Sequence, residues 1–198
     1  KRKKYYCGNE LDGVMNYPIK EGIISYLRYN DTGKLRYALS DIIFNAPTRI
    51  RNLQMNLLGS HDTMRILTAL GGESPEGKTN EYLLKARMND SELDNAVKKL
   101  KCAYTVLATL PGIPSIYYGD EAGMEGYSDP FNRRTYPWGN ENKTILSHYR
   151  KIGKIRRENS VYKSGDYKLL LLTDDLLVFS RDDEKYSFLT ILNNSKKD

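Results

Sequence analysis

Residues 55–65, MNLLGSHDTMR, are the most informative stretch of this chain. An apolar run ends there in a polar cluster that holds Asp62 and His61, one of only two histidines in the sequence. A short buried strand that delivers a histidine and a carboxylate at its C-terminal end is how (β/α) barrels present reactive side chains. The alternative is that Asp62 caps a helix starting at Thr63, where its oxygens would accept backbone N–H bonds. The elements on either side of the stretch favour the barrel interpretation.

Length and composition are those of an ordinary globular protein. The 198 residues can bury a substantial core, and 39% hydrophobic with 28% charged residues is a usual balance. No apolar run approaches the roughly 18 residues that a membrane-spanning helix needs. The basic run at residues 1–4 lacks an initiator Met and an apolar segment behind it, so we expect no signal peptide there. We therefore expect a piece of a larger chain. The sequence does not decide the cellular compartment, although it slightly favours the cytoplasm.

The net charge of +6 raises the question of a nucleic-acid ligand. Basic residues are interleaved with acidic ones, except in residues 1–4 and in 151–157, which resembles the wet face of a helix. No RNA-recognition, zinc-finger or helix-turn-helix signature is present. Two cysteines, Cys7 and Cys102, cannot by themselves make a disulfide framework or a metal site. We expect neither nucleic acid nor membrane as a partner.

Short apolar strands alternate with amphipathic helices over the first three quarters of the chain. Strands with little internal alternation, separated by helices, predict a parallel sheet with right-handed helical crossovers. Gly71 and Gly72 end one helix, and Ser91 with Asp94 forms a capping-box-like start for the longest. The expected strands are 11–18, 55–59 and 113–118, and the expected helices are 19–29, 35–44, 63–70, 91–110 and 144–157.

The character of the sequence changes near residue 160. Three expected strands, 167–172, 176–181 and 186–192, are separated by short acidic turns. Such spacing predicts antiparallel hairpins. We therefore expect two domains, residues 1–160 and 161–198.

Four motifs in the same order resemble the alpha-amylase family of glycoside hydrolases. They are LDGVMNYP at 11–18, NLLGSHDT at 56–63, LPGIPSIYYGDEAGM at 110–124 and DPFNRRTYPW at 129–138. The first and last are similar more narrowly to the neopullulanase and cyclomaltodextrinase branch. The resemblance implies an α/β fold in which the first three strands are the sixth, seventh and eighth of a (β/α)8 TIM barrel, followed by strands of a C-terminal β-sandwich. Because a whole barrel takes about 250 residues, we expect the C-terminal part of the barrel plus part of the sandwich.

The resemblance also implies a catalytic role for Asp62. Hydrolysis with retention needs a nucleophile and an acid/base carboxyl group, which the family carries on its fourth and fifth strands, absent from this chain. Asp62 resembles the family's third essential carboxylate, which favours the positively charged transition state. His61 resembles the histidine that hydrogen-bonds the same sugar hydroxyls. We expect the 198-residue chain alone to be inactive.

Three further residues are candidates for substrate binding. Arg65 lies about one helical turn after Asp62; it is assigned to substrate binding, with orientation of Asp62 or a solvent-facing position as alternatives. Asp129 and Arg133 lie in the loop after the expected eighth strand, on the active face of a barrel. In the resembled branch an Asp and an Arg at this place contact a sugar further along the substrate; the alternative is a weak surface ion pair. The acidic pair 120–121 resembles residues that organise the barrel rim.

The resemblance implies part of a retaining glycosidase for α-glucans: α-1,4-linked maltooligosaccharides, cyclodextrins or pullulan. The alternative is a non-catalytic carbohydrate-binding or structural module, which an exposed aromatic platform in residues 160–198 would favour. The sequence does not distinguish a hydrolase from a transglycosylase. It also does not distinguish a preference for α-1,4 linkages from one for α-1,6 linkages. We expect no cofactor in this chain, and a calcium requirement of the full-length enzyme stays open. Unpaired strand edges predict self-association.

Overall fold

The computed structural model describes residues 10–45 and 48–195, without the side chains of residues 41–49. Two short parallel strands stand at its centre, β1 (Met55–Leu57) and β2 (Ile113–Ser115), with Met55 opposite Ile113. On the other edge of β1, Met15 makes a single parallel bridge to Met55. The expected strand at 11–18 is thus reduced to this bridge, because Pro18 fits the first turn of a helix that already begins at Tyr17.

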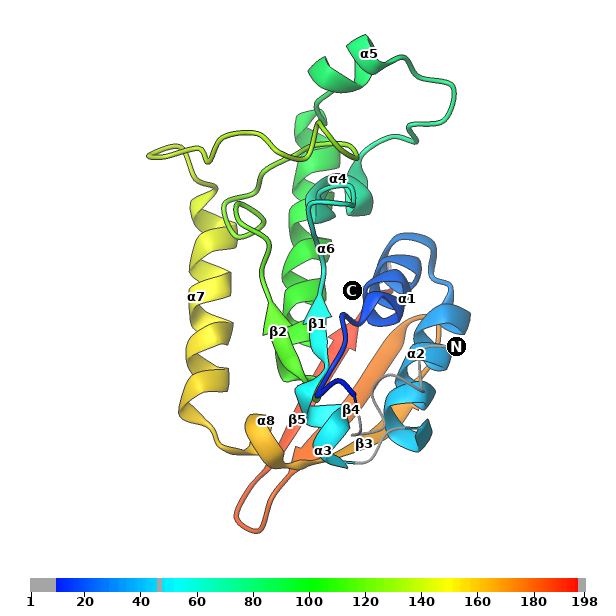
Figure 1. The fold of residues 1–198 in the computed structure, drawn as a ribbon, viewed down its shortest axis with the longest axis vertical. Coiled ribbons are helices and arrows are strands. Elements are labelled where there is room, and N and C mark those ends of the chain that lie inside the picture. The colour runs from blue at the N-terminus through cyan, green and yellow to red at the C-terminus, as the bar shows by residue number, and fades with distance from the viewer. Residues whose placement is uncertain (1–9, 46–47, 196–198) are drawn as a thin grey trace.

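Helices lie beside and behind the two strands, as Figure 1 shows. The longest, α6, packs against α1, α4 and α7, and α1 also contacts β1 and α2. In Figure 1, α7 lies on one side of β1 and β2, and α1 with α2 on the other. The helices are α1 (Tyr17–Tyr29), α2 (Thr32–Asn45), α3 (Thr48–Leu53), α4 (Ile66–Gly71), α5 (Asn80–Lys85), α6 (Asp90–Thr109), α7 (Lys143–Glu158) and α8 (Val161–Ser164).

The N-cap of α6 lies two residues before the expected one. Asn89, not Ser91, is the N-cap: its side chain accepts the N–H of Glu92, and the Glu92 carboxylate accepts the N–H of Asn89, both at 3.0 Å. The reciprocal pair satisfies two of the donors that a helix start leaves unpaired. The sequence predicted the right kind of cap at the wrong residue.

The last three strands form a separate antiparallel sheet in the order β3–β4–β5, as predicted. They are β3 (Asp166–Leu172), β4 (Leu176–Asp182) and β5 (Ser187–Asn193), and β3 carries an irregularity between Leu169 and Leu171. The division into residues 1–160 and 161–198 stays a prediction, since one hydrophobic core contains buried side chains from both parts, among them Leu107 and Phe179.

Two arginines join the sheet and α7 to the C-terminal end of α6. This helix has no basic residue in its last turn, where backbone carbonyls lack partners within the helix. Arg156 on α7 donates to the carbonyls of Ala108 and Leu110, and the fully buried Arg181 on β4 donates to that of Thr109. The distant guanidinium groups therefore take the place of a local basic cap.

None of the helices in the described part of the chain combines the length and the hydrophobicity that a membrane span requires.

Candidate functional site

His61 and Asp62 lie in the loop that follows β1, at its carboxyl end. Their side chains are 57% and 62% exposed, and Nε2 of His61 lies 3.1 Å from Oδ1 of Asp62. In Figure 1, β1 and β2 both point toward this end of the molecule, where α4 and α5 lie. Asp62 does not cap the next helix, because α4 begins only at Ile66. The alternative weighed from the sequence is therefore wrong.

The loop is held in a tight turn by its own hydroxyl groups. The N–H of Asp62 donates to Oγ of Ser60 at 3.2 Å, and the N–H of Ser60 donates to Oγ1 of Thr63 at 3.2 Å. Tyr17, at the start of α1, places its hydroxyl 3.3 Å from the same Ser60 oxygen. These contacts leave the Asp62 carboxylate and the His61 ring facing solvent on a backbone that is fixed beneath them.

Asn132 is the residue that sequence reasoning missed. Its side chain is fully buried, and its amide nitrogen donates to the carbonyls of His61 at 2.8 Å and Thr63 at 2.7 Å, with that of Ser60 at 3.4 Å. One side chain from the loop after β2 thus clamps the loop after β1. The only sequence signal was its place between Asp129 and Arg133 in the fourth motif.

Arg65 is buried and joins the two loops. Its Nε donates to the carbonyl of Asn132 at 2.8 Å, and its Nη1 donates to Oδ1 of Asp120 at 3.2 Å and to the carbonyl of Tyr118. The guanidinium carbon lies 4.3 Å and 4.5 Å from the ring centroids of Tyr117 and Tyr118, within the range of cation–π attraction. The solvent-facing alternative for Arg65 is therefore wrong, and its 1% exposure leaves almost no surface for a sugar.

Asp120 supplies the buried partner of Arg65. Burial raises the pKa of this carboxyl to about 7, and the neighbouring Arg65 opposes the rise. A Cβ at Gly59 would lie 2.3 Å from Oδ2 of Asp120, so only glycine lets β1 come this close to the carboxylate. Asp120 is thus enclosed beneath the loops and is inaccessible to a substrate.

Asp129 and Arg133 form an ion pair on the neighbouring loop. Nε of Arg133 lies 2.6 Å from Oδ1 of Asp129, and the side chains are 46% and 54% exposed. Asn132, between them in sequence, connects this loop to that of His61. The exposed pair is compatible both with sugar binding and with the weak surface ion pair that was its alternative.

No group of three or more His, Cys, Asp or Glu side chains in the described residues is arranged to hold a metal ion.

The comparisons with known proteins agree on one family. A family model described as the alpha amylase catalytic domain matches residues 1–164. The chain belongs to the alpha-amylase family. Among curated relatives, an amylopullulanase from Thermoanaerobacter thermohydrosulfuricus is 40% identical over 186 residues, which cover 88% of this chain and 12% of the relative. A cyclomaltodextrinase from Thermoanaerobacter pseudethanolicus is 32% identical over 194 residues, covering 96% and 30%.

Solved structures of alpha-amylase-family enzymes share this fold. A cyclic alpha-maltosyl-(1→6)-maltose hydrolase from Arthrobacter globiformis superposes with a TM-score of 0.78 at 26% identity, covering 96% of this chain and 39% of that one. The predicted fold class, part of a (β/α)8 barrel followed by antiparallel strands of a sandwich, is confirmed. The resemblance to the cyclomaltodextrinase branch is confirmed as well. The chain spans less than a third of the length of the two curated relatives named above.

Proposed function

We propose that this chain supplies the transition-state-stabilising carboxylate and part of the sugar subsites of a retaining α-glucan hydrolase. The substrate class is α-1,4-linked maltooligosaccharides, cyclodextrins or pullulan. The observation that carries the proposal is the adjacent pair of His61 and Asp62, solvent-facing at the carboxyl end of β1. Additional support comes from the relatives, which include cyclomaltodextrinases and amylopullulanases.

Asp62 acts on the sugar whose glycosidic bond breaks. Its carboxylate accepts hydrogen bonds from the hydroxyl groups of that sugar, and this interaction strengthens as positive charge develops on the ring in the transition state. His61 binds the same hydroxyls and, 3.1 Å from Asp62, helps to fix the direction of the carboxylate. The nucleophile and the acid/base group that retention requires are supplied from outside these 198 residues.

Asn132 and Arg65 hold this pair in position. Neither is exposed, so neither touches the substrate. Asn132 fixes the backbone carbonyls on both sides of Asp62, and Arg65 fixes the carbonyl of Asn132. A catalytic charge works best when its place is set before the reaction. We therefore assign Arg65 a positioning role in place of substrate binding.

Asp129 and Arg133 bind a sugar further along the glucan. Their support is their exposure and the link through Asn132 to the loop of His61. Both side chains offer charged hydrogen-bonding groups that a sugar hydroxyl can pair with.

The test is Asp62→Asn in the intact enzyme that carries this chain. Loss of a preorganised charge should lower kcat by a factor on the order of 10² or more, while the melting temperature moves by only a few degrees because the side chain is exposed. Asp174→Asn, an exposed aspartate in the turn between β3 and β4, is the matched control and should leave kcat unchanged. Near-normal turnover of Asp62→Asn would contradict the assignment.

A further inference from the structure

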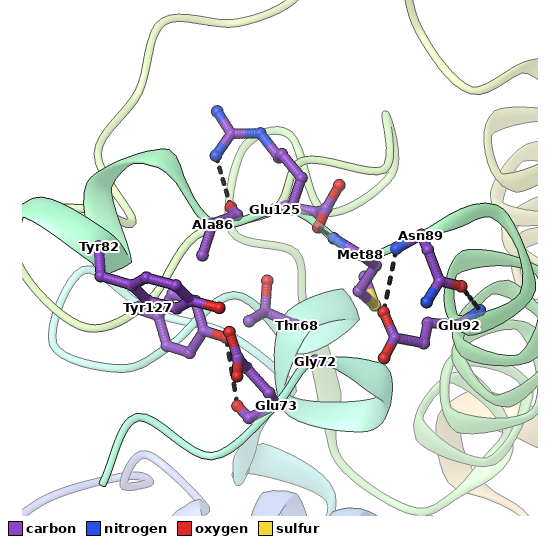
Figure 2. A pocket seen from close by; sticks show the side chains of 11 residues that line it. Thr68, Gly72, Glu73, Tyr82, Ala86, Met88, Asn89, Glu92, Glu125 and Tyr127 are labelled. Atoms are coloured by element: carbon purple, nitrogen blue, oxygen red, sulfur yellow. Dashed lines mark hydrogen bonds between the residues drawn. The ribbon is translucent and has the colours of Figure 1, made fainter. Parts of the chain in front are cut away.

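A cavity lies at the same end of the molecule as His61 and Asp62 (Figure 1). It has a volume of about 230 Å³ and lies between α4, α5, the start of α6 and the loop after β2. Figure 2 shows the side chains that line it. None of the exposed candidates proposed above to contact the glucan, His61, Asp62, Asp129 and Arg133, lines it. Among its lining residues are Glu73, Tyr82, Asn89, Glu92, Glu125 and Tyr127.

Aromatic rings form one side of this cavity. In Figure 2, Tyr82 and Tyr127 lie together, opposite Asn89 and Glu92. The hydroxyl of Tyr127 donates to the carbonyl of Glu73 at 3.2 Å. Nζ of Lys78 lies 4.5 Å from the Tyr82 ring centroid, and the same ammonium group pairs with Glu73 at 2.9 Å. The rings are therefore held in place by contacts of their own.

Two carboxylates with spare hydrogen-bonding capacity, Glu92 and Glu125, also line the cavity, together with Arg87, Met88 and Asn89. Oε2 of Glu125 accepts the N–H of Met88 at 2.9 Å, and Oε2 of Glu92 accepts the N–H of Asn89 at 3.0 Å. Within the described part of the chain, no hydrogen bond reaches Oε1 of Glu125 or Glu92. Each ionised carboxylate can accept about four hydrogen bonds. The cavity thus presents fixed acceptors opposite flat apolar rings.

Backbone contacts connect the cavity wall to the loop of Asp62. The N–H of Arg65 donates to the carbonyl of Gly126 at 2.9 Å, and the N–H of Gly126 donates to Oγ1 of Thr68 at 2.9 Å. Gly126 lies between Glu125 and Tyr127, which both line the cavity. The cavity wall is therefore bonded directly to the segment that follows Asp62.

We propose that this cavity binds one glucosyl residue of an α-glucan chain, away from the bond that is cleaved. Sugars combine hydroxyl donors, which suit the carboxylates, with apolar C–H faces, which suit the tyrosine rings. The volume is below the roughly 300–1,000 Å³ of pockets for drug-sized ligands, which fits a single ring of a longer chain. The inference rests on the proposed function, because that function makes α-glucans the substrate class.

Titration of the 198-residue chain with maltotriose, followed by isothermal calorimetry, tests the proposal. Tyr82→Ala should weaken binding about fivefold or more, the size of a lost aromatic contact. Tyr82→Phe keeps the ring and should bind within about twofold of the parent chain. Tyr37→Ala removes an exposed tyrosine outside the cavity and is the matched control, with unchanged binding expected. Circular dichroism of each variant verifies that the fold is retained.

A second pair of variants separates this site from the reacting one. Glu125→Gln keeps an acceptor for Met88 but removes the charge, and it should weaken maltotriose binding, while Asp62→Asn should leave binding at the cavity in place. If Asp62→Asn abolished binding and Tyr82→Ala did not, the cavity proposal would be overturned and the role of Asp62 would stand. Binding of putrescine at the cavity with no response to maltotriose would overturn it too, because the carboxylates would then serve a cation. Tyr82-dependent maltotriose binding by the 198-residue chain, together with full turnover of the Asp62→Asn form of the intact enzyme, would uphold the cavity and remove the proposed function.

Discussion

Replacing Asn132 with leucine tests whether one buried amide holds the loop of Asp62. The change removes two good hydrogen bonds, to the carbonyls of His61 at 2.8 Å and Thr63 at 2.7 Å, and a weak one to Ser60 at 3.4 Å. A buried acceptor left without a partner costs about 1–3 kcal/mol. Two such acceptors, partly relieved by water at the exposed loop, give an expected loss of about 2–4 kcal/mol in the free energy of unfolding.

Urea unfolding of Asn132→Leu measures that loss, and hydrogen exchange locates it. The N–H groups of Asp62 and Thr63 bond to Ser60 within the clamped turn, so their exchange should accelerate. Asn56→Leu is the matched control. Asn56 is equally buried, donates to the carbonyl of Pro111 at 2.8 Å and accepts from Asn16 at 2.9 Å. It should destabilise the protein without accelerating exchange in the turn beyond the global effect.

In the intact enzyme, Asn132→Leu and Asn56→Leu should differ in kcat. A displacement of about 1 Å in a catalytic group can lower the rate about 10²-fold, so Asn132→Leu should reduce kcat well below Asn56→Leu at temperatures where both are folded. If the N–H groups of Asp62 and Thr63 exchanged equally fast in both variants, and kcat were also equal, Asn132 would not hold the loop in place. The contacts of Asn132 would then contribute only to stability.

Three other predictions follow from the geometry. Arg133→Ala in the intact enzyme should raise KM and leave kcat nearly unchanged, the mark of lost uniform binding; a collapse of kcat at constant KM would move Arg133 into the chemistry. Because burial raises the pKa of Asp120 to about 7, this carboxyl adds stability that is present below about pH 4 and is lost as pH rises through 7. The melting temperature of the parent chain minus that of Asp120→Asn should therefore fall from about pH 4 to about pH 8, and a constant difference would refute the shifted pKa. The isolated chain should show no turnover of cyclodextrin and should self-associate in light scattering, because β2 has a described ladder with β1 alone; a stable monomer would remove the edge argument.

Long periodic elements were predictable from the sequence. The expected helices 91–110 and 144–157 and the three C-terminal strands agree with the structure to within one or two residues at each end. A helix of that length repeats its apolar face several times, and a hairpin strand is bounded by its turns. In contrast α3 and α5 have six residues each, too few for a period to show. The one local signal is at α5, whose start is capped by Thr79.

The candidate site likewise contains residues that the sequence suggested and contacts that it did not. Asp62 and His61 became candidates because they follow an apolar run directly. Asn132 did not, because its partners are backbone carbonyls 69 to 72 residues away, and no local pattern records such a contact. The burial of Arg65 was equally hidden. A charged residue one turn after a polar cluster has the same sequence signature whether it faces solvent or is buried against two tyrosine rings.

The hydrogen bonds of Asn132 and Arg65 couple the two loops mechanically. Asp62 lies on one loop, and the ion pair of Asp129 and Arg133 lies on the other. The buried Asn132 belongs to the second loop and is hydrogen-bonded to the first. A shift of the second loop, by sugar binding at Arg133 or by mutation, must move the carbonyl or the amide of Asn132. It would therefore reach the backbone of Asp62 without any contact between the two exposed sites. Under the proposed function, binding energy from a distant sugar can in this way be used to place the Asp62 carboxylate, which is how remote contacts raise kcat.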